Sequence, residues 1–328
     1  VTSYERNDAV DNRHPLYIGA LGRAGAPEAA EAVRQADVLL ALGTRLSHFT
    51  TFYDYRYIPE DARIIQVEID QREIGRNYPV SVGILGDAGA VAADLVRRLE
   101  GAVPEETRNA RAGRVDVLRK ARLQRLEEEG GLEGLPMKPQ RVYAELRRGL
   151  PRDTAVVFDA GGGPSYGYDR VEFSGPRTLF STLDLACLGA ALPQAIGVKM
   201  ARPDQPVVSI SGDGGFFFNA QELETSVRWR VPVVNIVLNN DSWGSEKAYQ
   251  RMLYDERYVE SDITNPRYDK LAELCGARGF YAETPEEVGE AVREALAADG
   301  PSVIEIPVDP DELPQPARTA DVFQARGG

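Results

Sequence analysis

The segment from Pro206 to Glu246 constrains the fold of this 328-residue chain more than any other. It predicts an apolar strand at Val207–Ser211, a glycine-lined loop that holds one acid, a helix, a second apolar strand at Val231–Leu238 and a polar turn. Two parallel strands joined by a crossover helix end at the same edge of a sheet, where open α/β sheets bind their ligands. We therefore expect the chemistry to lie between Asp213 and Asn240.

The rest of the chain also alternates short apolar strands with helices, which is typical of doubly wound parallel sheets. The predicted fold is α/β, with two doubly wound parallel-sheet domains, the first of them a partial Rossmann-like domain. Residues 1–103 form this first domain, in which 36–46 predicts a buried strand ending at Gly43. The predicted parts that follow are a helical linker at 104–136, a second domain at 137–310 and a Pro-, Arg- and Gly-rich tail at 311–328.

Charge and patterning exclude several classes of protein. The formal net charge is −13 and no long basic run occurs, so neither a nucleic acid nor an anionic membrane is an expected partner. No apolar stretch approaches the roughly 20 residues of a membrane span, and no signal peptide opens the sequence, which favours a cytoplasmic protein. The two cysteines and two histidines are too far apart in sequence for a disulfide framework or a zinc motif.

Oxygen-bearing residues follow both strands of the central segment. Asp213 offers a carboxylate, the Asn240 side chain a carbonyl and Ser242 a backbone carbonyl, which are ligands that a hard cation such as Mg²⁺ shares readily with a phosphate. Gly214 and Gly215 would leave backbone N–H groups open to diphosphate oxygens. Further along, Asn219 and Glu222 have the spacing of a capping box at the start of the crossover helix.

These residues resemble the cofactor motif of thiamine diphosphate-dependent enzymes, in which GDG, a helix and NN after an apolar strand bind thiamine diphosphate and Mg²⁺. ADVLLALGTRL, IIQVEID and ILGDA are similar to the central domain of the acetolactate synthase and 2-oxo acid decarboxylase group. The resemblance implies Asp213, Asn240 and Ser242 as metal ligands. It also implies that Ala186 and Leu188, in ACLGAALPQAIG, lie at the cofactor rings, and that six glycines neighbour the diphosphate: Gly161, Gly162, Gly163, Gly212, Gly214 and Gly215.

The resemblance predicts Mg²⁺-dependent C–C bond cleavage, acyl transfer or carboligation on a small 2-oxo acid or aldehyde, as in acetolactate synthases. SYERNDAV, HPLYIGALGRAG and WGSEKAYQRMLYDERYV are most similar to the sulfoacetaldehyde acetyltransferases, which gives acetyl transfer to phosphate as the alternative. GGFFFN and the triple glycine at 161–163 depart from that pattern. Four residues past the metal turn are candidates for substrate contact, with Lys247 facing an anionic group: Trp243, Glu246, Lys247 and Gln250.

Members of this family carry an N-terminal pyrimidine-binding domain whose glutamate activates the cofactor, and no such domain occurs in this sequence. We expect that domain on the same polypeptide or on a separate chain, and a homo-oligomer. VTSY at the start predicts the end of a strand inside the central domain. The resemblance leaves open whether the first domain binds FAD or ADP.

Two other classes stay open. The parallel sheets permit a dinucleotide-binding oxidoreductase, although the glycines at 19–25 precede a helix without a strand before them. A non-catalytic fragment would retain the motif without the activating glutamate. Taken singly, the glycine turns, Leu188 and residues 243–250 also have ordinary structural interpretations, as tight turns, core and a solvated helix start.

Overall fold

The computed structural model describes residues 1–55 and 57–314 of the chain. It contains two compact units, of which the first holds Val1–Arg6 with His14–Gln124, and the second holds Asn7–Arg13 with the described residues from Arg125 onward. Each unit is built on one sheet in which all strands run parallel. The prediction of two parallel-sheet α/β domains is confirmed, whereas the predicted tail lies outside the described residues beyond Pro314.

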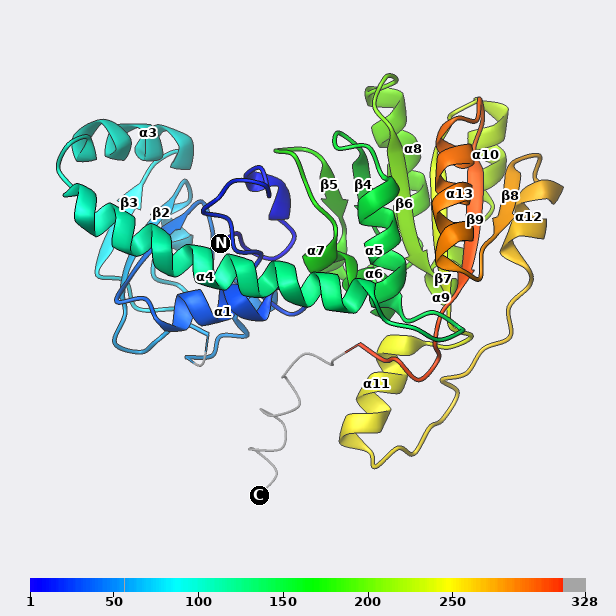
Figure 1. Cartoon of the computed structure of the whole chain (residues 1–328), viewed down its shortest axis with the longest axis horizontal. Helices are drawn as coiled ribbons and strands as arrows, with labels where there is room; N and C mark the ends of the chain where they lie inside the picture. Colours follow the sequence, from blue (N-terminus) through cyan, green and yellow to red (C-terminus); the bar gives the residue numbers. More distant parts are fainter. Residues whose placement is uncertain (56, 315–328) are drawn as a thin grey trace. The chain divides into compact units, whose positions relative to one another are not determined.

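The first unit has a three-stranded sheet in the order β1-β2-β3 (Figure 1). Its core includes Val33, Ala41 and Ile64, which join the first helix to the sheet. The elements of this unit are α1 (Pro27–Arg34), β1 (Val38–Leu42), α2 (His48–Thr51), β2 (Arg63–Glu68), η2 (Gln71–Glu73), β3 (Val82–Leu85) and α3 (Ala88–Leu99).

Two predictions for the first unit are wrong. Strand β1 is not buried, because Val38, Leu40 and Leu42 are 39%, 47% and 40% exposed, and only the opposite face of the strand packs into the core. Side chains alternate between the faces of a strand, so an apolar run alone does not show that both faces are covered. The segment Val1–Tyr4 forms no strand, since Thr2 makes only an isolated parallel bridge to Ala20.

One long helix, α4 (Glu105–Gly130), occupies most of the predicted linker at 104–136. The two units divide within this helix, between Gln124 and Arg125. No helix in the described part of the chain combines the length and the apolar character needed to cross a membrane.

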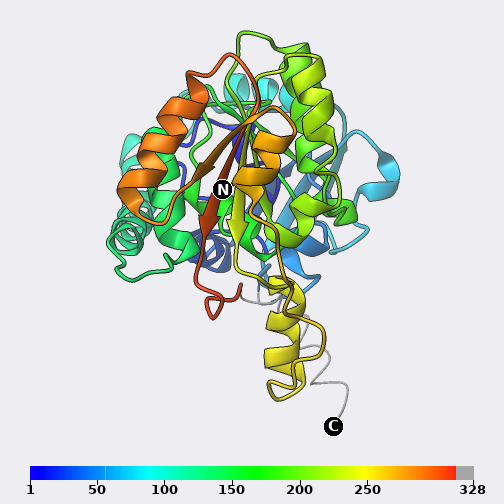
Figure 2. The same cartoon turned by 90° about the vertical axis from the view of Figure 1, so that its right-hand side faces the viewer.

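The second unit has a six-stranded sheet in the order β5-β4-β6-β7-β9-β8. Helices α8, α10 and α12 cover one face of it, and α5 and α13 cover the other (Figure 2). The elements of this unit are η1 (Asn7–Ala9), α5 (Pro139–Gly149), β4 (Ala155–Phe158), α6 (Gly162–Ser165), α7 (Gly167–Arg170), β5 (Leu179–Ser181), η3 (Leu183–Leu185), α8 (Ala191–Ala201), β6 (Val207–Gly212), α9 (Asp213–Phe217), α10 (Glu222–Arg228), β7 (Val234–Asn239), α11 (Gly244–Leu253), α12 (Tyr268–Leu274), β8 (Arg278–Tyr281), α13 (Pro285–Leu296) and β9 (Ser302–Pro307).

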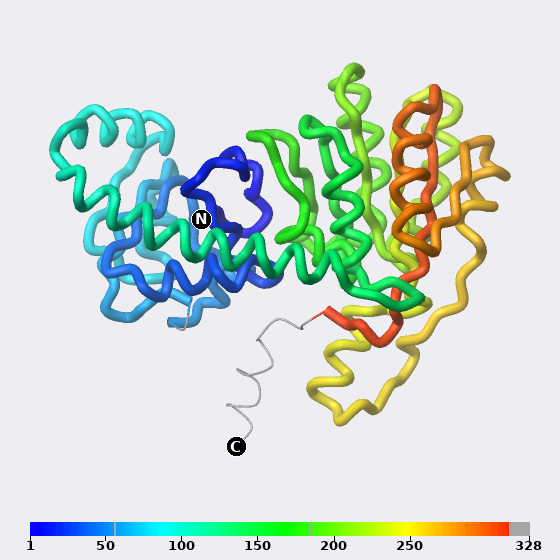
Figure 3. The backbone as a smooth tube through the Cα atoms, in the orientation of Figure 1, coloured from blue at the N-terminus to red at the C-terminus, as the bar shows by residue number. Residues whose placement is uncertain are grey.

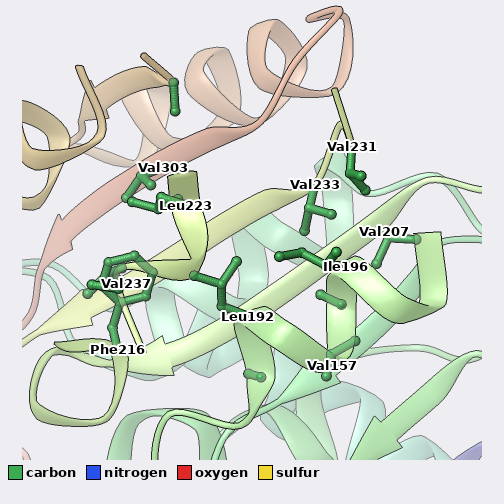
Figure 4. Packing of buried hydrophobic residues seen from close by; sticks show 14 of the residues in the cluster. Val157, Leu192, Ile196, Val207, Phe216, Leu223, Val231, Val233, Val237 and Val303 are labelled. Atoms are coloured by element: carbon green, nitrogen blue, oxygen red, sulfur yellow. The ribbon is translucent and has the colours of Figure 1, made fainter. Parts of the chain in front are cut away.

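The core of the second unit lies between the sheet and the layer of α8, α10 and α12. Val157, Val237 and Val303 from three strands pack against Leu192 and Leu223 from two of these helices (Figure 4). Each fully buried side chain of this size stabilises the fold by about 1.5–3 kcal/mol. Because the strands of a parallel sheet are covered on both faces, their sequences are continuous apolar runs. These runs are the reason that the strands could be predicted from the sequence.

The winding direction of the second sheet reverses between β4 and β6. After β4 the chain moves outward to β5, and after β6 it moves to the other side, to β7. The loops that leave these two neighbouring strands therefore diverge and open a crevice at the carboxyl edge, where doubly wound sheets bind ligands. Helices α6, α9 and α11 gather at this edge (Figure 1).

The structure corrects the predicted strand and loop bounds around the central unit. β7 begins at Val234 rather than Val231, because Pro232 has no N–H to donate to a neighbouring strand. The polar segment 241–266 contains α11, which agrees with a helix start within 243–250, and then a turn and a return to Pro266 without regular secondary structure (Figure 3).

Two glycines of the second unit make a matched test of this packing. A Cβ on Gly279, in β8, would lie 2.0 Å from the carbonyl oxygen of Asp269, whereas a Cβ on Gly289, in α13, would meet nothing within 4 Å. We expect Gly279→Ala to lower the free energy of unfolding by about 1–3 kcal/mol. Gly289→Ala should raise it by about 0.5–1 kcal/mol. Urea unfolding followed by circular dichroism measures both, and equal effects would contradict the packing of β8.

Candidate functional site

The pairing of β6 with β7 places Asp213 and Asn240 at one edge of the sheet. Gly212, the last residue of β6, is in register with Leu238 of β7. Asp213 opens α9 directly after β6, and Asn240 follows the last residue of β7. The prediction that the loops after these two strands lie at the same edge of a parallel sheet is confirmed.

A carboxylate, a side-chain amide and a backbone carbonyl converge at this point. The Asn240 amide lies 3.2 Å from Asp213 Oδ1 and 3.0 Å from the Ser242 carbonyl oxygen. Neighbouring ligands of an octahedral cation with bonds of 2.0–2.1 Å lie about 3 Å apart, which is the length of these two contacts.

Without a cation, the Asn240 Nδ2 donates to Asp213 Oδ1 and the Ser242 carbonyl, and its Oδ1 accepts from Ser242 Oγ at 2.9 Å. A 180° turn of this amide would bring its Oδ1 beside the other two oxygens, as a bound cation requires. No group of three or more His, Cys, Asp or Glu side chains suited to a metal occurs in residues 1–55 and 57–314. The donor set here is instead carboxylate, amide and backbone oxygen, which suits a hard divalent cation.

Burial dominates the electrostatics of Asp213, which is 2% exposed. It raises the pKa of the Asp213 carboxyl to about 6, although hydrogen bonds from Asn265 and the N–H groups of Gly214 and Asp213 itself act against the shift. A cation bound between the three oxygens would favour the ionised carboxylate and lower this pKa.

Gly214 and Gly215 are required by close packing. A Cβ on Gly214 would lie 2.5 Å from a ring carbon of Trp243, and a Cβ on Gly215 would lie 2.5 Å from Asp159 Oδ2. The ring of Trp243 also contacts Phe218 edge-on, with centroids 6.0 Å apart. The role of these glycines as diphosphate neighbours stays a prediction, together with that of Gly212.

Asp159 is a residue of the site that the sequence analysis missed. It follows β4, is 1% exposed, and accepts hydrogen bonds from the backbone N–H groups of Gly189 (2.9 Å) and Ala190 (3.1 Å). These bonds fasten the start of α8 to the end of β4 and bring residues 186–190 beside the Asp213 turn. The available signal was an acid directly after a buried strand, which is the same signal that identified Asp213.

The triple glycine also lies at this edge. Gly161 has φ +128°, a conformation that favours glycine, and a Cβ on Gly162 would lie 2.9 Å from the ring of Pro314. A Cβ on Gly163 would lie 3.2 Å from Leu238 of β7. The turn therefore needs small residues where it meets β7 and the segment that ends at Pro314.

The loop before α8 contains the two residues predicted at the cofactor rings. Ala186 is exposed and Leu188 is half-buried. A Cβ on the following Gly189 would lie 2.6 Å from Phe218 Cβ, so the loop packs on the end of α9. The roles of Ala186 and Leu188 at the cofactor rings stay predictions.

The predicted capping box at Asn219 and Glu222 is wrong. The residue at the N-cap of α10 is Gln221, and no side chain caps this helix. The Asn219 amide instead donates to the Gly189 carbonyl at 2.9 Å, because the chain continues in tight turns between α9 and α10. Asn219 therefore ties the loop before α8 to the Asp213 turn.

The four substrate-contact candidates differ in their surroundings. Trp243 covers Gly214, and Glu246 is exposed on α11. Lys247 Nζ lies 2.7 Å from Asp262 Oδ1 and above the ring of Tyr258. Gln250 binds the backbone of Val259, donating at 3.0 Å and accepting at 2.7 Å. Lys247 and Gln250 therefore fasten the return segment to α11, and a substrate contact by either would replace these partners.

Comparison with known families agrees with this geometry. Residues 1–95 match the model of the thiamine pyrophosphate enzyme central domain, and residues 159–306 match that of the thiamine pyrophosphate enzyme C-terminal TPP binding domain. The chain belongs to the thiamine pyrophosphate enzymes and carries these two of their domains. The predicted family is thus confirmed, and thiamine diphosphate is the cofactor that it implies.

Three individual relatives carry different names. Sulfoacetaldehyde acetyltransferase of Castellaniella defragrans is 33% identical, in an alignment that covers 99% of this chain and 59% of the relative. A probable acetolactate synthase large subunit of Methanocaldococcus jannaschii is 32% identical, with 95% and 54% covered. A putative thiamine pyrophosphate-containing protein, YdaP of Bacillus subtilis, is 29% identical, with 100% and 55% covered. The chain spans less than two thirds of the length of each.

The buried Asp159 carboxyl predicts a pH dependence. Burial raises its pKa from 3.8 to about 6, against the effect of its backbone hydrogen bonds. The folded state therefore favours the protonated form, and this contribution to stability is present below pH 4 and is lost as the pH rises through 6. The free energy of unfolding of the wild type, relative to Asp159→Asn, should fall by roughly 3 kcal/mol between pH 4 and pH 7.

Urea unfolding at several pH values measures this difference. A pH-independent difference for Asp159→Asn would show that its carboxyl titrates normally.

Proposed function

We propose that this protein is a thiamine diphosphate- and Mg²⁺-dependent enzyme that cleaves or forms a C–C bond beside the carbonyl group of a small 2-oxo acid or aldehyde. The observation that carries the proposal is the cluster of the Asp213 carboxylate, the Asn240 side-chain amide and the Ser242 carbonyl at the carboxyl ends of β6 and β7. Family membership indicates the cofactor, and the oxygen atoms of these three groups support the metal.

The residues present fit a cation that is shared with a diphosphate. Asp213, Asn240 and Ser242 would hold Mg²⁺, which keeps further coordination positions for phosphate oxygens. The glycine turns at 161–163 and 212–215 would let the diphosphate approach the backbone closely. Lys247 is paired with Asp262, so in this acidic chain the cation would supply the positive charge.

When bound, thiamine diphosphate supplies an electron sink for a carbanion that forms beside a carbonyl group. The residues of this chain would bind and orient that cofactor. Asp159 and Asn219 would keep Leu188 and its loop against the Asp213 turn, and Trp243 would shield that turn from water. The proposal includes a pyrimidine-binding domain that supplies the activating glutamate, a homo-oligomer and a cytoplasmic location.

Asp213→Ala should abolish Mg²⁺-dependent binding of thiamine diphosphate. Loss of a residue that only orients a metal ligand weakens metal binding by about 10–100-fold, so loss of the ligand itself should exceed about 100-fold. Isothermal titration calorimetry on the full-length protein measures the affinity for the cofactor with and without Mg²⁺. The exposed Asp204 is a matched control in the same unit, and Asp204→Ala should bind as the wild type does. Unchanged affinity in Asp213→Ala would remove Asp213 from the ligand set.

Sulfoacetaldehyde acetyltransferase is a second candidate activity. Relatives of that name from Castellaniella defragrans and Alcaligenes xylosoxydans xylosoxydans are 33% and 34% identical over almost the whole chain. In this reaction the sulfonate group leaves as sulfite and the remaining two-carbon unit is transferred to phosphate as an acetyl group.

An assay of the full-length protein separates the two candidates. With thiamine diphosphate and Mg²⁺, we expect acetyl phosphate and sulfite from sulfoacetaldehyde and phosphate if the second activity holds, and no acetolactate from pyruvate. Formation of acetolactate alone would favour the synthase. Asp213→Ala should lose either activity, which controls for a contaminating enzyme.

A further inference from the structure

Asn265 contacts the carboxylate of Asp213 through the oxygen that does not face Asn240. Asp213 Oδ1 faces the Asn240 side chain, whereas Asp213 Oδ2 accepts a hydrogen bond of 2.7 Å from Asn265 Nδ2. The two oxygens of the Asp213 carboxylate therefore have different partners. Oδ1 faces the Asn240 amide, and Oδ2 accepts from Asn265, at the far end of the 241–266 segment.

The orientation of the Asn265 side chain is determined by its neighbours. Its Nδ2 has two further acceptors, Asn239 Oδ1 at 3.1 Å and Asp241 Oδ1 at 3.0 Å. Its Oδ1 accepts from the hydroxyl of Tyr268 at 2.8 Å. A rotated amide would place an oxygen among three acceptors, so only the observed orientation satisfies these groups.

The partners of Asn265 are themselves fixed by Glu305 on β9. Its Oε1 accepts from the Asn239 amide at 3.0 Å, and its Oε2 accepts from the backbone N–H of Tyr268 at 2.8 Å. Pro266 also restricts the backbone of Asn265 to extended conformations. Asn265 is therefore held by Asn239 at the end of β7 and Tyr268 at the start of α12, and Glu305 of β9 binds both of these residues.

We propose that Asn265 is a positioning residue of the metal site, which holds Asp213 Oδ2 so that Asp213 Oδ1 alone faces Asn240 and Ser242. The inference rests on the proposed function, because it needs a cation at these oxygens. The terminal torsion of an aspartate is broad, so a carboxylate without this partner could rotate or offer both oxygens to the ion. Residues that orient metal ligands typically change metal affinity by about 10–100-fold.

A purely structural role for Asn265 makes a different prediction. If Asn265 only closed the 241–266 segment, its loss would lower the stability of the protein and leave the affinity of the folded protein for Mg²⁺ unchanged. Metal affinity and unfolding must therefore be measured separately.

Asn265→Leu is the sharpest variant, because leucine has the same branching as asparagine and lacks both polar groups. Mg²⁺ is titrated into the full-length protein at saturating thiamine diphosphate, and the dissociation constant is measured by calorimetry. We expect it to rise by about 10–100-fold. Thermal unfolding without Mg²⁺ measures the structural effect of the substitution.

Asn235→Leu is the matched control. Asn235 is buried in the same sheet, where it accepts from Ser209 Oγ at 2.6 Å and donates to the Ser302 carbonyl at 3.0 Å. This variant should unfold at a lower temperature and bind Mg²⁺ as the wild type does. Tyr268→Phe removes a hydroxyl that lies 2.8 Å from Asn265 Oδ1 and 2.9 Å from the Asp213 carbonyl oxygen, and keeps the bond from Asn265 to the Asp213 carboxylate. It should weaken Mg²⁺ binding less than Asn265→Leu.

The outcomes separate this inference from the proposed function. Mg²⁺ binding that is unchanged in Asn265→Leu, or weakened equally in Asn235→Leu, overturns the positioning role alone. Absence of Mg²⁺ and thiamine diphosphate binding by the wild type overturns the proposed function, and the inference with it. If Asn265→Leu does not fold, Asn265→Ala decides, since it also removes the donor to Asp213 Oδ2, and wild-type affinity in that variant contradicts the inference.

Discussion

The second unit depends on one constraint, the burial of the Asp213 carboxylate at the carboxyl end of β6. An ionised group loses several kcal/mol of hydration when it is buried, unless hydrogen bonds or opposite charge replace the water. No Lys or Arg side chain is among the described partners of Asp213, so its partners are amides, N–H groups and, in the proposed holoenzyme, a cation. These partners come from distant parts of the sequence, and the loops that carry them must therefore meet at one point.

Asp159 and Asp213 are buried acids at the ends of neighbouring strands, yet their surroundings give them different roles. Asp159 accepts hydrogen bonds from the backbone N–H groups at the start of α8. Asp213 Oδ2 accepts from Asn265, and Asp213 Oδ1 lies 3.2 Å from the Asn240 side-chain amide. The Asp159 carboxylate therefore fastens one loop to the sheet. The Asp213 carboxylate has an amide and a backbone carbonyl close by that can also be metal ligands, which is why we place the metal at Asp213.

The amino-acid sequence predicts the sheets and the central pair well, because both rest on local patterns. Continuous apolar runs mark β4, β6, β7 and β9, and the spacing of Asp213 and Asn240 follows from one crossover. What it could not predict depends on contacts between distant residues. Asn265 lies 52 positions from Asp213 along the chain, and only the fold brings them together. The exposed face of β1 and the bond from Asn219 to Gly189 also depend on which elements become neighbours.

The same electrostatics links the two groups that the site is proposed to bind. A diphosphate placed beside a buried carboxylate would be repelled by it, and the chain has an acidic net charge with Lys247 already paired. A cation between the Asp213 carboxylate and the diphosphate converts this repulsion into two attractions. By thermodynamic linkage, the metal must then strengthen cofactor binding by the same factor by which the cofactor strengthens metal binding. An acidic protein can in this way bind an anionic cofactor without a cluster of lysines or arginines, provided that the carboxylate is held in one orientation.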